Sequence, residues 1–164
     1  MYKKNDYLVY GKDVCKVYDI ETQKFNNEDY YLLRPIKNKD LKISAPITDK
    51  AKKIRPLITK EEIDNLIKEI PSIEIITTEN KFIEAEYKKI LQNPTHKDLI
   101  RIIKTTYLHN KKRLDNNKKI TEKDKIYFEQ AEEYLYHELS IVLNLSYEET
   151  KQYIIDKVTA LTKK

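Results

Sequence analysis

The hydrophobic residues of this chain follow two different periods, and the change from one to the other falls near residue 58. Before that point, short runs rich in Val, Ile, Leu and Tyr are separated by turn residues, which is typical of small antiparallel strands. After it, apolar residues recur every three to four positions, which is typical of amphipathic helices. The pattern therefore predicts an α+β protein with a β domain at residues 1–58 and an all-α domain at residues 59–164.

Five candidate strands fall within the first 58 residues. Pro35 and Pro46 lie where runs end, and Asn26-Asn27 has the chemistry of a hairpin tip because Asn tolerates positive φ. Strands this short cannot bury a good core as a flat sheet, so we expect a small, partly closed barrel of the SH3 or Tudor kind. The expected strands are Tyr7–Tyr10, Val14–Ile20, Tyr30–Arg34, Leu41–Ile47 and Ile54–Leu57.

The second segment predicts a compact bundle of about five helices. Three helix starts are marked by a Ser or Thr that precedes an acidic residue by three positions. These starts are Thr59/Glu62, Thr121/Asp124 and Ser146/Glu149. Pro71 and Pro94 fall between apolar stripes, as helix breakers should. One expected core stripe comprises Leu99, Ile102, Ile103, Thr106 and Tyr107.

The composition excludes several classes of function. Gly11 is the single glycine, whereas phosphate-binding loops and dinucleotide fingerprints need several glycines at fixed spacing. The single cysteine, Cys15, cannot form an internal disulfide and is expected to be a small, half-buried strand residue. His96, His109 and His137 lack metal-ligand spacing, and no catalytic motif occurs. We therefore expect no enzyme, no cofactor, no metal site and no small-molecule substrate.

The chain also lacks the sequence features of membrane and secreted proteins. No apolar run approaches the roughly 18 residues needed to span a bilayer, and the first residues lead into no secretory hydrophobic segment. Both signs of charge are mixed with a normal apolar content, which argues against disorder. We expect a cytoplasmic protein without a membrane partner.

Positive charge is distributed unevenly along the chain. Residues 1–58 contain 13 Lys and Arg against 8 Asp and Glu, and residues 59–164 contain 19 of each. Within the second segment, residues 101–119 hold seven basic residues and one acidic residue, whereas residues 120–150 hold eight acidic and two basic residues. The helical segment is therefore electrically polarised.

The basic residues of this segment predict a surface for a phosphate backbone. Lys97, Arg101 and Lys104 follow i, i+4, i+7 spacing opposite the apolar stripe, and this cationic stripe leads into a basic loop. Such a surface binds nucleic acid without sequence preference and with strong salt dependence. The alternative is a solvated face whose lysines pair with acidic neighbours. The candidate DNA-binding residues are Lys97, Arg101, Lys104, Lys111, Lys112, Arg113, Lys118 and Lys119.

Five collinear segments carry a resemblance to a known family. They are Asp6–Tyr10, Leu41–Pro46, Asp98–Lys104, Ile120–Ala131 and Tyr134–Leu139. Their order, with a Tudor-like domain before a helical domain, resembles the CarD/CdnL family of bacterial transcription regulators over nearly the whole chain.

The resemblance implies two partners. The first domain would bind the β subunit of RNA polymerase, as the related domain of transcription-repair coupling factors does. The helical domain would contact promoter DNA at the upstream edge of the transcription bubble and alter the lifetime of the open complex. Lys42 and Ser44 lie on the strand that matches the polymerase-binding edge, where the family often has arginine at the position of Ser44. Lys125 matches a basic position of the family and is either a DNA contact or a surface lysine.

One departure from the family concerns an aromatic wedge. The family commonly places a Trp near the start of the second helix of the helical domain, where it enters the minor groove. This chain has no Trp and carries Asn80 at the matching position. Phe82 is the nearest aromatic residue and is the candidate wedge, since apolar side chains inserted between base steps are a known minor-groove strategy. The alternative is that Phe82 packs in the core beside Ile83 and Tyr87, and the adjacent apolar stripe favours this interpretation.

The sequence is also compatible with a function from a second class. A Tudor-like barrel followed by a basic helical domain also suits a two-domain protein that binds RNA or the ribosome without any polymerase contact. The two hypotheses differ in the partner of the first domain.

Overall fold

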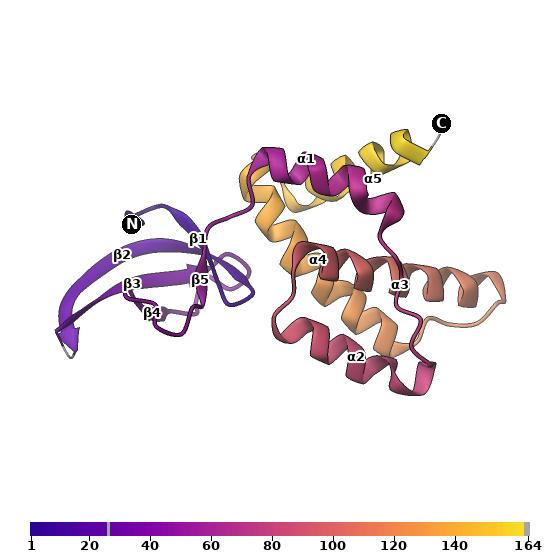
Figure 1. Cartoon of the computed structure of the whole chain (residues 1–164), viewed down its shortest axis with the longest axis horizontal. Coiled ribbons are helices and arrows are strands. Elements are labelled where there is room, and N and C mark those ends of the chain that lie inside the picture. The colour runs from indigo at the N-terminus through magenta and orange to yellow at the C-terminus, as the bar shows by residue number, and fades with distance from the viewer. Residues whose placement is uncertain (26, 163–164) are drawn as a thin grey trace. The chain divides into compact units, whose positions relative to one another are not determined.

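The computed structural model describes residues 1–25 and 27–162, and it divides the chain into two compact units at residues 1–58 and 59–164. The boundary coincides with the change in hydrophobic period. The first unit contains β-strands and the second contains helices, so the α+β class is confirmed (Figure 1). The strands are β1 (Tyr7–Tyr10), β2 (Asp13–Phe25), β3 (Glu28–Pro35), β4 (Ile43–Pro46) and β5 (Ile54–Arg55).

The five strands form one antiparallel sheet in the order β4-β3-β2-β1-β5. Among the described strands, β4 and β5 are its two edges, and no pairing joins them, so the sheet is open. Irregularities between Val17 and Asp19 and between Glu21 and Phe25 interrupt the β2–β3 register. Such irregularities bend strands and increase their twist. The core under the sheet consists of Leu8, Cys15, Val17, Tyr31, Leu33 and Ala45.

Only β1 has the expected limits, and β3 is longer than expected at both ends, running from Glu28 to Pro35. Strand β2 extends to Phe25 rather than ending at Ile20, because its ladder with β3 resumes after each irregularity. Strand β4 begins at Ile43 rather than Leu41, and β5 is two residues long. Asn27, at the expected hairpin tip, has the positive φ of 57°, whereas Asn26 lies outside the described residues.

Cys15 is fully buried in this core rather than half-buried. Burial raises the pKa of its thiol to about 12, so the thiolate that reacts with oxidants or metals is not populated at neutral pH. Gly11 forms the turn between β1 and β2 with φ of 65°, a conformation that glycine adopts without steric cost. The single cysteine and the single glycine are therefore both structural.

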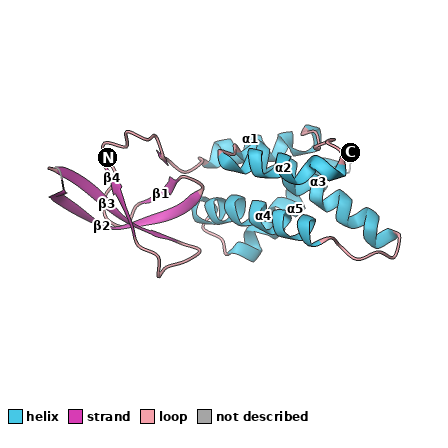
Figure 2. Cartoon of the chain, turned by 90° about the horizontal axis from the view of Figure 1, so that it is seen from below, coloured by secondary structure: helices cyan, strands magenta, loops and turns pink. Residues whose placement is uncertain are grey.

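Within residues 59–162, the second unit contains five α-helices and one short 3₁₀ helix, and all the regular structure described there is helical (Figure 2). The expected capping residues Thr59, Thr121 and Ser146 each accept a backbone N–H at a helix start, which confirms them. Thr95 forms a further capping box with Asp98 that the sequence analysis did not predict. The helices are α1 (Lys60–Glu69), η1 (Ile70–Ser72), α2 (Asn80–Gln92), α3 (His96–Asp115), α4 (Glu122–Leu143) and α5 (Tyr147–Thr162).

The core of this unit lies mainly between α3 and α4, with α2, α1 and α5 packed around them. Ile63, Ile83, Tyr87 and Ile102 are fully buried, as the helical period predicts. Tyr107, which was expected in the buried stripe of this helix, is instead 56% exposed. The core therefore ends before the last turns of α3.

The segment between η1 and α2 has no regular structure and is held by a buried hydroxyl. Thr105 on α3 is fully buried, and its Oγ1 accepts a hydrogen bond of 2.9 Å from the backbone N–H of Ile76. The same hydroxyl donates to the carbonyl of Arg101 at 2.7 Å. Ile76 is itself buried, so Thr105 supplies a partner that water cannot replace.

We expect Thr105→Val to lower the free energy of unfolding by about 1–3 kcal/mol, because the buried N–H of Ile76 loses its acceptor. Thr105→Ser is the control, since it keeps the oxygen and removes one methyl group, at a cost of about 1 kcal/mol. Urea denaturation followed by circular dichroism measures both. A Val variant as stable as the Ser variant would contradict this role.

Candidate nucleic-acid interface

The end of α3, the turn after it and the starts of α2 and α4 surround a polar pocket of about 320 Å³, here called the basic pocket. The side chains that define it are Lys112, Arg113, Lys118, Asn80, Thr121 and Asp124, and His109 also lines it. Two cationic groups from the end of α3 and one from the turn after it therefore lie around one opening. In Figure 1, α3 leads into this turn, which returns the chain to α4.

The turn after α3 is closed tightly by its own hydrogen bonds. The backbone N–H of Lys118 donates to the carbonyl of Arg113 at 2.8 Å, and Asn117 has φ of 57°. The Nε of Arg113 donates to the carbonyl of Lys119 at 2.6 Å. These bonds fold residues 116–119 back onto the helix end. The cationic side chains of Lys112 and Lys118 thereby come to the same pocket although they are six positions apart.

The start of α4 supplies the other wall of the basic pocket. Thr121 caps the helix, and its Oγ1 lies 2.9 Å from the Oδ2 of Asp124. The Asp124 side chain is only 4% exposed, and its Oδ1 lies 3.5 Å from Nδ1 of His109 on α3. The N-terminal end of a helix carries a partial positive charge that attracts anions. The carboxylate of Asp124 offsets part of this charge within the pocket.

The predicted DNA-binding residues fall into two groups that lie at different places on the helical unit. Lys112, Arg113 and Lys118 line the basic pocket, and Lys111 and Lys119 are exposed next to them. Lys125 is exposed in the first turn of α4.

The remaining three predicted residues, Lys97, Arg101 and Lys104, belong to the first half of α3. Along the helix they lie about 12 to 22 Å before Lys112, and none of them lines the basic pocket.

The cationic stripe expected from Lys97, Arg101 and Lys104 is not a free phosphate-binding face. Lys97 forms an ion pair of 2.7 Å with Glu69, and the guanidinium of Arg101 lies 4.0 Å from Asp98. The ammonium group of Lys104 donates to two backbone carbonyls, those of Ile70 at 2.8 Å and Ile73 at 2.5 Å. Lys104 thus satisfies the carbonyl ends of α1 and η1, which helices otherwise leave without partners.

Phe82 lies in the first turn of α2 and is 57% exposed, so the core alternative is wrong. Its neighbour Ile83 is fully buried and is the residue that packs in the core. The ammonium group of Lys81 lies 5.0 Å from the centre of the Phe82 ring, and Asn80, two positions before Phe82, lines the basic pocket. The Phe82 ring is therefore exposed at the start of α2 and has the ammonium group of Lys81 over it.

Sequence reasoning missed two residues of this surface. Lys123 on α4 donates to both the backbone and the side-chain oxygen of Asn80 at 3.2 Å, which ties the starts of α2 and α4 together. Lys81 adds a charge at the Phe82 ring. Neither lies in the basic run of residues 101–119, so the charge count along the chain could not find them.

In the first unit, Lys42 and Ser44 are exposed, and Ser44 belongs to the edge strand β4. The N–H of Ile47 donates to the carbonyl of Asp29 on the β3 side, at 3.0 Å. Hydrogen-bonded and non-hydrogen-bonded pairs alternate in an antiparallel ladder, so the backbone N–H of Ser44, which pairs with Leu32, points away from β3. Pro46 shares this outward direction, as an edge proline should. Ser44 is therefore a backbone donor at a free sheet edge.

No family model matches the chain, and no curated protein matches it at a significant level. None of the helices that the structure describes combines the length and the hydropathy required to cross a membrane. Within the same described residues, no cluster of three His, Cys, Asp or Glu side chains is placed to hold a metal ion.

Phe82→Ala should change the free energy of unfolding by at most about 0.5 kcal/mol, because an exposed ring contributes little to folding. Ile83→Ala is the matched control at the next position, and it should lose about 2–5 kcal/mol. Urea denaturation measures both. Equal losses in the two variants would mean that the Phe82 ring packs in the core.

Proposed function

We propose that this chain is a transcription regulator of the CarD/CdnL type, in which the sheet unit binds the β subunit of RNA polymerase and the helical unit binds promoter DNA. The observation that carries the proposal is the basic pocket, whose cations can bind phosphates, together with an exposed Phe82 in the first turn of the helix that contributes Asn80 to that pocket. The collinear resemblance over both units supports it. The Tudor-like identity of the open sheet in the first unit is part of this proposal.

The DNA contact follows from the chemistry of the helical unit. Lys112 and Lys118 offer ammonium groups to backbone phosphates, and such contacts carry no sequence information. Phe82 would insert between base steps at the edge of the melted region, where unstacking costs least. The two contributions differ in salt dependence, because only the phosphate contacts release counterions. The outcome would be an altered lifetime of the open complex.

The double variant Lys112→Glu/Lys118→Glu should weaken binding to fork-junction promoter DNA at least about tenfold and reduce the salt slope by about 2. The double variant Lys68→Glu/Lys157→Glu, at exposed positions on α1 and α5, makes the same charge change away from the basic pocket. It should bind DNA within about threefold of the unmodified chain. Fluorescence anisotropy at several salt concentrations measures both. Equal losses would show that net charge, and not this pocket, binds DNA.

The same assay separates the wedge from the phosphate contacts. Phe82→Ala should remove the preference for fork-junction DNA over plain duplex while leaving the salt slope unchanged. Retained preference for the fork would assign the DNA contact to the cations alone.

The polymerase contact is proposed at the β4 edge, because a free row of backbone groups can pair with a strand of a partner. Ser44→Pro removes the outward N–H without removing a bond to β3, so it should lower affinity for the isolated β subunit at least about tenfold. Ser44→Ala keeps the N–H and should bind like the unmodified chain. Biolayer interferometry with folded variants measures this. Full affinity of the Pro variant would place the contact elsewhere.

The alternative function is binding to RNA or the ribosome. The exposed cations and the free sheet edge suit that class as well. Capture from a bacterial lysate by the full chain distinguishes the two. Recovery of ribosomal components without the polymerase β subunit would favour the alternative, whereas recovery of the β subunit that Ser44→Pro abolishes would support the regulator.

A further inference from the structure

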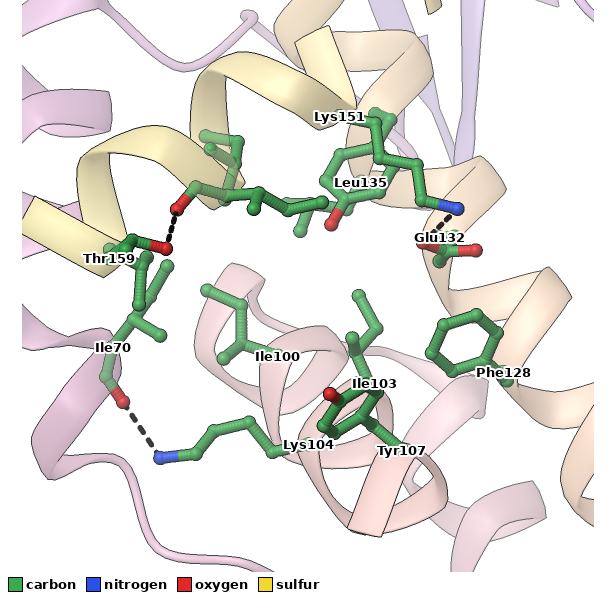
Figure 3. A pocket seen from close by; sticks show the side chains of 14 residues that line it. Ile70, Ile100, Ile103, Lys104, Tyr107, Phe128, Glu132, Leu135, Lys151 and Thr159 are labelled. Atoms are coloured by element: carbon green, nitrogen blue, oxygen red, sulfur yellow. Dashed lines mark hydrogen bonds and ion pairs between the residues drawn. The ribbon is translucent and has the colours of Figure 1, made fainter. Parts of the chain in front are cut away.

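A second pocket lies on the helical unit among α3, α4 and α5, with a cavity volume of about 460 Å³, and we call it the apolar pocket. Each of the three helices presents one face to it, since Ile100, Ile103 and Tyr107 on α3 recur at helical spacing. Figure 3 shows these side chains together with Phe128 of α4 around the same space. A surface pocket of this size is large enough to hold a small molecule.

The walls of the apolar pocket remain partly open to solvent. Tyr107 on α3 is 56% exposed and Ile155 on α5 is 46% exposed, although both carry large apolar surfaces. Pockets of about 300–1,000 Å³ with apolar and aromatic walls are the usual sites of small molecules. The volume and the wall chemistry both fall in that class.

One end of the apolar pocket carries polar groups that are buried. Glu132 of α4 is 6% exposed, and its Oε2 lies 3.4 Å from the ammonium group of Lys151 (Figure 3). Burial raises the pKa of the Glu132 carboxyl despite that ammonium group. Tyr136, one turn further along α4, is 5% exposed and also lines the pocket. Within the part of the chain that the structure describes, its hydroxyl forms no hydrogen bond.

Among the described residues, the Tyr136 hydroxyl is not one of the buried polar atoms that lack a partner, so this hydroxyl opens onto the pocket although most of the side chain is buried. Here the hydroxyl belongs to a side chain that faces a hollow, beside a carboxylate with acceptor capacity beyond its one ion pair. A ligand group that both donates and accepts, such as a hydroxyl, would satisfy Glu132 and Tyr136 together. A net charge on the ligand is not required, because Lys151 already balances Glu132.

The other cation that lines the apolar pocket is not available to a ligand. The ammonium group of Lys104 is held by the carbonyls of Ile70 and Ile73 (Figure 3 draws the first of these). The polar end of the apolar pocket is thus the Glu132, Lys151 and Tyr136 group, and the other lining residues are mainly apolar.

We infer that the apolar pocket binds a small, neutral and mainly apolar molecule whose single hydroxyl group reaches Glu132 and Tyr136. This site is separate from the basic pocket and from the β4 edge, so it does not depend on the proposed function. The recessed position of the polar groups favours a small molecule over a helix of a partner, because a helix lies along a groove and reaches its floor only with side chains.

The test uses the full chain and the neutral fluorescent probe N-phenyl-1-naphthylamine. The probe should bind with one-to-one stoichiometry, and 4-phenylphenol should displace it at a concentration at least tenfold lower than biphenyl does. Biphenyl has the same two rings without the hydroxyl. Tyr136→Phe should remove that tenfold difference while leaving probe binding in place.

A variant that fills part of the apolar pocket tests whether the probe binds there. Ile155→Trp adds volume at a half-open wall of the apolar pocket and should weaken probe binding at least tenfold, whereas Leu114→Trp, at an exposed position on α3 outside the pocket, should not. Sedimentation velocity accompanies both variants. Probe binding that survives Ile155→Trp, or equal displacement by the two competitors, would overturn the inference. A dimer that Ile155→Trp dissociates would overturn it as well, because a second copy would then cover the pocket.

Discussion

The antiparallel packing of α3 on α4 is held in register by two pairs of a histidine and a buried carboxylate, and the rest of the helical unit depends on it. At one end, Nε2 of His96 lies 3.0 Å from Oε1 of Glu138, which is 2% exposed. At the other end, Nδ1 of His109 lies 3.5 Å from Oδ1 of Asp124, which is 4% exposed. A shift of one helix along the other would separate both pairs, and a buried carboxylate that loses a partner costs free energy.

This register determines where both pockets of the helical unit lie. The His109–Asp124 end brings the start of α4 next to the last turn of α3, and the basic pocket forms there. The same α3 presents Ile100 and Ile103 to the apolar pocket. Lys104 then ties α3 to the end of α1 through the carbonyls of Ile70 and Ile73. One helix therefore contributes to the core, to a cationic surface and to an apolar hollow.

The sequence predicts those features that depend on local chemistry. The boundary at residue 58, the β1 limits and the caps at Thr59 and Thr121 follow from period and from side-chain hydrogen bonding within four residues. Strand β2 runs longer than predicted, because its end is determined by pairing with β3 and not by its own composition.

Local sequence patterns could not predict the partners or the burial of several site residues. Lys104 has the same sequence pattern as a phosphate-binding lysine, yet its ammonium group is held by carbonyls more than 30 positions away. Phe82 and Ile83 are adjacent apolar residues, and only the packing of α2 decides which of them is buried. A charge count or an apolar stripe cannot distinguish these cases, because each depends on which acceptor or which neighbour comes within reach after folding.

The buried carboxylate of Asp124 also constrains how the proposed DNA contact can occur. A phosphate placed deep in the basic pocket would approach that carboxylate, and two negative charges close to each other repel. The ammonium groups of Lys112 and Lys118 can instead follow a phosphate backbone that passes across the opening, because both side chains are long and exposed. Asp124 would then exclude deep anion binding while the rim stays cationic. This arrangement suits a backbone contact that is sensitive to salt and indifferent to sequence, with Phe82 as the group that distinguishes melted from paired DNA.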